Sequence, residues 1–174
     1  MTEIKKTGET TKKKSVPLTD NTMIKVKSIY YGKVYYANRR SGELTIWENI
    51  GDIQVMPFSE LRIMKAEQVA FFKRQWIMIV GVADGEKCTA TPAEIYHALA
   101  IEQYYKNFVD PSDFRELCDM SIETIKEKIS LMSESAKENL IVALNDFIRD
   151  GTLDSIKKIK AFEETLGCEL RENI

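Results

Sequence analysis

The sequence has little histidine and cysteine, and this scarcity excludes several kinds of functional site. Among 174 residues there is one histidine, His97, and there are three cysteines, Cys88, Cys118 and Cys168. Three widely spaced cysteines make neither a disulfide framework nor a zinc pattern, so we expect reduced thiols and no metal site. His97 lies in the helix-like apolar stretch EIYHALAIEQYY, which favours a structural or surface position over a catalytic one.

Motifs for catalysis and nucleotide binding are also missing from the sequence. No GxxxxGK[ST], GxGxxG, HExxH, GxSxG or CxxC occurs, so we predict a protein that is not an enzyme and uses no cofactor. No apolar run approaches the roughly 18 residues that span a bilayer. The first lysines are not followed by the apolar segment of a secretory signal. We therefore expect synthesis in the cytoplasm and no membrane contact.

The net charge of −2 conceals a strong division along the chain. Residues 1–21 carry five lysines and three acids, which gives +2. Residues 22–88 carry ten basic and seven acidic residues (+3), and residues 89–174 carry ten and seventeen (−7). Composition changes at the same places. We predict a flexible polar arm over 1–21, a small β domain over 22–88 and a helical domain over 89–174.

Short alternating segments bounded by glycine and polar turns predict strands in the middle of the chain. Residues 23–37 form two strands or one long strand bent at Gly32, with Ile24 and Val26 on one side and Lys25 and Lys27 on the other. Further strands are expected at 44–47, 53–56 and 76–82, with a hairpin loop over 38–42. A helical stretch capped by Ser59 is expected over 59–74, either continuous or broken near Ala66-Glu67. These elements predict an α+β protein that begins with a small SH3-like β barrel or sandwich carrying a helical insertion.

Capping residues and apolar stripes predict an all-α C-terminal part of about five short helices. Their starts are expected at Thr91, Asp110, Ser121, Ser133 and Leu153. Gly151 and Gly167 are expected to end the last two helices. In the final helix, the predicted buried stripe consists of Ile156, Ile159, Phe162 and Leu166.

Basic side chains alternate with tyrosines in the predicted β domain. Charge for phosphate and rings for base stacking are what a single-stranded nucleic-acid surface needs. Tyrosines are also ordinary strand residues, and lysines protect strand edges. Because +3 over 67 residues is a weak charge excess, nucleic-acid binding is the less favoured interpretation. The residues concerned are Lys33, Arg39, Arg40, Lys73 and Arg74, with Tyr30, Tyr31, Tyr35 and Tyr36.

Two basic segments are the candidate partner-binding residues. They are Lys12, Lys13 and Lys14 in the arm, and Arg39 and Arg40 at the hairpin tip. The arm is either a solvated terminus or a segment that becomes ordered on a neighbouring subunit or on nucleic acid. The acidic helical part suits a basic partner, which includes the basic front of a neighbouring copy.

The run from Gly32 to Ile79 resembles small proteins encoded by tailed bacteriophages of low-GC Gram-positive hosts. The resemblance rests on a spaced pattern and on a later Lys157-Lys158-Ile159-Lys160. It implies a virion structural or assembly protein, in the capsid, head–tail connector or tail, that works in repeated copies through contacts with other virion proteins. The alternative is a phage regulator that binds single-stranded nucleic acid. The pattern consists of Gly32, Val34, Tyr35, Gly42, Trp47, Gly51, Asp52, Gln54, Met56, Glu60, Leu61, Met64, Phe71, Phe72, Trp76 and Ile77.

Overall fold

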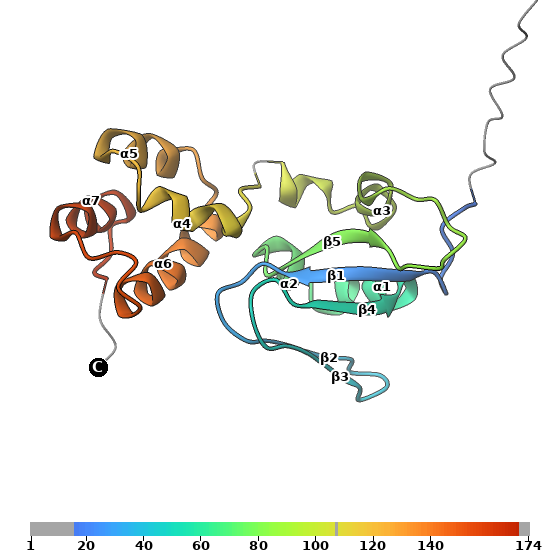
Figure 1. Cartoon of the computed structure of the whole chain (residues 1–174). Coiled ribbons are helices and arrows are strands. Elements are labelled where there is room, and N and C mark those ends of the chain that lie inside the picture. Colours follow the sequence, from blue (N-terminus) through green and yellow to red (C-terminus); the bar gives the residue numbers. More distant parts are fainter. Residues whose placement is uncertain (1–15, 107, 171–174) are drawn as a thin grey trace, which may run out of the picture.

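A computed structural model of the chain describes residues 16–106 and 108–170. Within these residues the chain forms strands and helices (Figure 1), which confirms the predicted α+β class. The strands are β1 (Met23–Ser28), β2 (Val34–Ala37), β3 (Leu44–Trp47), β4 (Ile53–Pro57) and β5 (Ile77–Val82). The α-helices are α1 (Phe58–Glu67), α2 (Ala70–Lys73), α3 (Pro92–Leu99), α4 (Phe114–Leu117), α5 (Ile122–Ser130), α6 (Glu134–Arg149) and α7 (Ile156–Leu166). Two short 3-10 helices are η1 (Glu102–Tyr105) and η2 (Pro111–Asp113).

The strands pair in two antiparallel groups. One sheet has the order β4-β1-β5, and β2 pairs with β3 as a separate hairpin. Ile24 and Val26 are buried while Lys25 and Lys27 are partly exposed, so the predicted sidedness of β1 is confirmed. The segment 23–37 forms two strands, separated at Gly32, where φ is +149°. The closed SH3-like barrel stays a prediction, because the described backbone pairing forms two sheets.

The first hydrophobic core lies between the strands and helices α1, α2 and α3. Trp47 is buried at its centre, and its indole Nε1 donates to the carbonyl oxygen of Val26 at 3.0 Å. Ile95 and Leu99 of α3 and the following Ile101 belong to this core. The predicted boundary at residue 88 is therefore wrong for α3, which packs on the strands because its apolar side faces them. We call residues 16–105 the β unit.

The N-terminal limit of the β unit also differs from the prediction. Residues 16–21 were expected in the flexible arm, but Leu18 packs against the first core and Asp20 forms an ion pair with Arg62 at 2.8 Å. The apolar side chain of Leu18 therefore holds this segment against the β unit. The rest of the predicted arm, residues 1–15, lies outside the described residues.

Local capping signals account for most helix boundaries. Thr91 and Glu94 form the two reciprocal hydrogen bonds of a capping box at the start of α3. Ser121 and Ser133 accept hydrogen bonds from backbone amides at the starts of α5 and α6. Gly167 ends α7 in the left-handed conformation, with φ at 67°. These four signals were predicted and are confirmed.

Two predicted helix limits are corrected, and one expected break is found. Helix α1 begins at Phe58 with Pro57 in the capping position, so Ser59 is not the cap; the carbonyl oxygens of Thr22 and Asp20 accept from the first amides of the helix instead. The stretch 59–74 divides into α1 and α2 after Glu67, where the break was expected. The helix that starts after Thr91 ends at Leu99, where Ala100 adopts a positive φ of 52°, and the chain resumes as η1.

The second hydrophobic core is formed by the helices that follow residue 108, which we call the helical unit (residues 108–170). Its fully buried side chains include Phe114, Phe147 and Phe162, and the predicted stripes of α5 and α6 face this core. The prediction for α7 is partly wrong. Ile156 is exposed, because the helix starts there and the buried position is taken by Leu153 in the preceding loop.

A buried polar joint connects the β unit to the helical unit. The backbone amide of Tyr31, in the loop after β1, donates to Oδ1 of Asn139 at 3.1 Å, and Nδ2 of Asn139 donates to the carbonyl oxygen of Ile29. Asn139 is on α6 and is buried. Figure 1 shows this end of β1 beside the helical unit. One side chain thus satisfies two backbone groups that would otherwise lose their water partners.

Aromatic packing surrounds the joint. The Tyr31 ring stacks on Phe114 with centroids 6.3 Å apart and meets Phe147 edge-on at 5.5 Å. Its hydroxyl donates to the carbonyl oxygen of Pro111 at 3.3 Å. An ion pair between Lys27 and Asp110, with 3.6 Å between nitrogen and oxygen, adds a further link. The side chain of Tyr31 is therefore part of the helical unit's core although its backbone belongs to the β unit.

We predict that Asn139→Ala destabilises the protein by about 1–3 kcal/mol, because it leaves the Tyr31 amide and the Ile29 carbonyl without partners. Chemical denaturation followed by fluorescence and circular dichroism measures the change. Asn49→Ala, on an exposed turn, is the matched control and should stay within about 0.5 kcal/mol of the wild type. Equal stability of the two variants would contradict the role assigned to the joint.

Candidate interaction surface

Four large apolar side chains of strands β2, β3 and β4 point outward instead of into a core. Their exposed fractions are 55% for Tyr35, 58% for Leu44, and 48% each for Ile53 and Val55. In β2 and β3 the alternation is clear, because Tyr36 and Trp47 face inward. We call these four residues the outer β surface. Grouped exposed apolar residues of this kind are typical of contact sites.

The two edges of the three-stranded sheet are treated differently. At the edge of β5, the amide of Ile79 donates to the hydroxyl of Tyr96 at 3.0 Å, and the hydroxyl of Tyr105 donates to the carbonyl oxygen of Ile77 at 2.6 Å. Burial raises the pKa of both tyrosines, so their hydroxyls stay protonated. The β5 edge is therefore covered by side chains that satisfy its backbone.

The edge formed by β4 is treated differently, because the hairpin lies beside it without forming backbone pairs with it. In the described part of the chain, β4 pairs through its backbone with β1 alone. A side-chain bond connects β4 to the hairpin: Nε2 of Gln54 donates to the carbonyl oxygen of Ile46 at 2.8 Å. Every second residue of an edge strand directs its amide and carbonyl away from the sheet. With Ile53 and Val55 exposed beside it, this edge can accept another strand.

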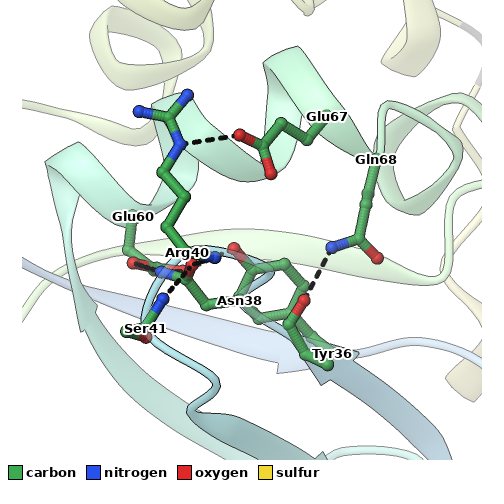
Figure 2. A network of polar contacts seen from close by, with 8 residues as sticks. Tyr36, Asn38, Arg40, Ser41, Glu60, Glu67 and Gln68 are labelled. Carbon is green, nitrogen blue, oxygen red and sulfur yellow. Dashed lines mark hydrogen bonds and ion pairs between the residues drawn. The ribbon is translucent and has the colours of Figure 1, made fainter.

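A polar network clamps the hairpin to α1 (Figure 2). The hydroxyl of Tyr36 donates to Oε1 of Glu60, and Nδ2 of Asn38 donates to both carboxylate oxygens of Glu60 at 2.8 Å. Oδ1 of Asn38 accepts from the backbone amides of Arg40 and Ser41, at 2.7 and 3.1 Å. Burial, followed by the hydrogen bond to Glu60, raises the pKa of Tyr36 strongly.

Two longer side-chain bonds extend the clamp. Nε2 of Gln68 donates to the carbonyl oxygen of Ala37 at 2.8 Å, and Nε of Arg40 contacts Oε1 of Glu67 at 2.7 Å (Figure 2). The hairpin is thus attached to both ends of α1. Its outward residues Tyr35 and Leu44 are presented at a fixed position, which lowers the entropy cost of binding a partner.

The two arginines predicted at the hairpin tip are both exposed, but their surroundings differ. Arg40 is part of the clamp through Glu67. Arg39 has no ion-pair partner within residues 16–106 and 108–170, so it remains a candidate contact residue. Lys12, Lys13 and Lys14 lie outside the described residues.

Part of the predicted basic, tyrosine-rich surface is taken up in the two cores. Tyr31 is inserted into the helical unit and Tyr36 is buried. Tyr30 packs edge-on against Trp76, with centroids 6.3 Å apart. Of the four tyrosines, Tyr35 alone is exposed, and nearby Lys33 is paired with Glu48 at 2.5 Å. Tyr31 and Tyr36 are therefore not available for base stacking, while Arg74 lies over the ring of Trp76, and nucleic-acid binding through the remaining residues stays a prediction.

The described residues were also searched for metal sites and membrane spans. No group of three or more histidine, cysteine or acidic side chains in residues 16–106 and 108–170 is arranged to hold a metal ion. Within the same residues, no helix has the length and apolar character to cross a bilayer.

His97 is on the surface and contacts Glu102 at 2.6 Å. Burial raises the pKa of the Cys118 thiol to about 11, which keeps it neutral.

Comparison with known proteins adds no assignment: family models, curated proteins and solved structures were all searched, and none matches the chain. The functional argument therefore depends on the sequence and on the geometry of the surface.

The exposed apolar residues were not predicted from the sequence, which pointed to charged contact residues instead. Ile53 and Val55 alternate with Gln54 and Met56 in a way that is equally consistent with either side facing the core. One signal was present: Trp47 and Met56 are the larger side chains of their strands and are buried, which leaves their neighbours outside.

We predict that stability falls as the pH rises above about 10, the ordinary pKa of tyrosine, because Tyr36 is held protonated in the folded protein and ionises more easily when unfolded. Below that pH its contribution is complete. Tyr36→Phe should therefore show a shallower loss of stability between pH 9 and about pH 11 than the wild type. Thermal unfolding over this pH range measures the difference, with Tyr35→Phe as the exposed control. Identical pH profiles for wild type and Tyr36→Phe would contradict the clamp.

Proposed function

We propose that the protein is a non-enzymatic bacteriophage virion structural or assembly protein that acts through protein–protein contacts. The observation that carries this proposal is the open β4 edge with Ile53 and Val55 exposed beside it. Such an edge binds another polypeptide through backbone hydrogen bonds and selects it through apolar side chains. The partner is a second virion protein or a further copy of the chain.

Three further features support an assembly role. The hairpin is clamped to α1, so the outer β surface is preorganised. The buried joint at Asn139 holds two units together, which suits a component that must fix the spacing of its neighbours. The resemblance to small proteins of tailed bacteriophages implies a place in the capsid, connector or tail. An SH3-like arrangement of the five strands is the finer fold assignment that goes with this proposal.

The proposal is tested by replacing the exposed apolar residues of β4. We expect the double variant Ile53→Lys, Val55→Lys to fold normally but to be incorporated into phage particles at least tenfold less than the wild type, because charge on the edge strand blocks strand addition. Particles are purified from cells that produce the phage encoding the variant, and quantitative mass spectrometry gives the copy number.

Ile156→Lys is the matched control, because Ile156 is an exposed apolar residue on the helical unit. It should be incorporated like the wild type. Circular dichroism checks that both variants are folded. Absence of the wild-type chain from both particles and assembly intermediates would overturn the proposed function, and equal incorporation of all three proteins would overturn the assigned surface.

A further inference from the structure

The helical unit carries an apolar groove that the joint does not use. The groove lies between the segment η2–α4 and the helix α5, with a volume of about 250 Å³. Leu117, Met120 and Met132 contribute to its apolar lining, and Leu131 stands at the groove with 74% of its side chain exposed. An apolar side chain of a partner would cover Leu131 and fill this space.

The groove is bordered by carboxylates. Asp113 and Glu116 line it, together with Lys128 from α5. Neither carboxylate has an ion-pair partner within residues 16–106 and 108–170, and neither side chain accepts a hydrogen bond there. Residues 108–170 contain fourteen acidic and eight basic residues, a net charge of −6. The groove therefore favours a partner that combines an apolar side chain with neighbouring cations.

We propose that the groove binds residues 1–15 of a second copy of the chain. This segment carries five lysines and two glutamates, a net charge of +3. Its sequence includes Ile4 followed by Lys5 and Lys6, which provides one apolar anchor beside two cations. Ile4 enters the apolar part of the groove, and the two ammonium groups pair with Asp113 and Glu116. This inference rests on the proposed assembly function and names one partner for it.

The position of the first described residue favours binding between chains. Val16 and Leu18 lie beside Thr89 and Ala90, which precede α3, and beside Glu94 and Ala98 within it. Figure 1 shows this end of the β unit on the side away from the helical unit. Ile4 lies twelve residues before Val16, and twelve extended residues reach about 40 Å, which is longer than the diameter of a small domain, about 30 Å. The segment is thus long enough to reach the groove of a neighbouring molecule.

Each molecule in this arrangement uses its N-terminal segment on one neighbour and its groove on another. The two surfaces are different, so the contact is head-to-tail, and repetition produces either a closed ring or an open chain of subunits. Because cations of one molecule meet carboxylates of the next, association weakens as salt screens the charges.

The test measures self-association of the full chain by sedimentation velocity over a range of protein concentrations, at 50 mM and 500 mM salt. We expect the wild type to associate more strongly at 50 mM salt. The arm variant Ile4→Asp and the groove variant Asp113→Lys, Glu116→Lys should each raise the dissociation constant at least tenfold. The variant Glu138→Lys, Asp154→Lys makes the same charge change at exposed acids elsewhere on the helical unit, and it should stay within about twofold of the wild type.

Mixing the two defective variants tests the head-to-tail geometry directly. The groove variant keeps its arm and the arm variant keeps its groove, so an equimolar mixture should form a one-to-one dimer and nothing larger. A wild type that is monomeric at every concentration, a control that weakens association as much as the groove variant, or a mixture that stays monomeric would each overturn the inference. These outcomes leave the proposed function standing as long as the Ile53→Lys, Val55→Lys variant is lost from particles, so the two failures are distinguishable.

Discussion

The contact between Asn139 and the loop after β1 is the interaction on which the arrangement of the whole chain depends. A buried amide that bonds one donor and one acceptor has a single favourable orientation, because rotation would leave both backbone groups unsatisfied. The same loop leads into the hairpin, so fixing Tyr31 also fixes where β2 begins. The joint therefore sets the position of the helical unit and anchors the hairpin that carries part of the outer β surface.

Polar side chains satisfy the backbone at one edge of the three-stranded sheet and not at the other. The β5 edge is satisfied by the hydroxyls of Tyr96 and Tyr105, while the β4 edge is left open with Ile53 and Val55 exposed. Proteins ordinarily protect an edge strand with charge, proline or a covering element, because an unprotected edge promotes uncontrolled association. An edge without backbone pairing in a clamped unit therefore supports the proposal that a partner strand binds there.

Local features of this fold were predictable from sequence, and long-range ones were not. Thr91, Ser121, Ser133 and Gly167 act within a few residues of their own position, so their sequence signals were sufficient. The alternation of apolar and polar residues predicted the strands, but it did not predict which side of β4 is exposed. The packing of α3 on the strands, and the role of Asn139, depend on residues far apart in the chain: Asn139 pairs with a loop more than a hundred residues away. An asparagine within a helical stripe carries no local sign of such a contact.

The joint at Asn139 also relates the two proposed contact surfaces to each other, because they lie on different units. The outer β surface belongs to the β unit, and the acid-bordered groove belongs to the helical unit. If the two units moved freely, neighbours bound at these surfaces would adopt many relative orientations, and repeated contacts would not form a regular assembly. Burying a polar side chain costs free energy unless every bond is made, and a hydrophobic contact would hold the units together as well. Asn139, with both of its bonds made, therefore specifies the orientation of the two units, which is a property that the proposed assembly role would use.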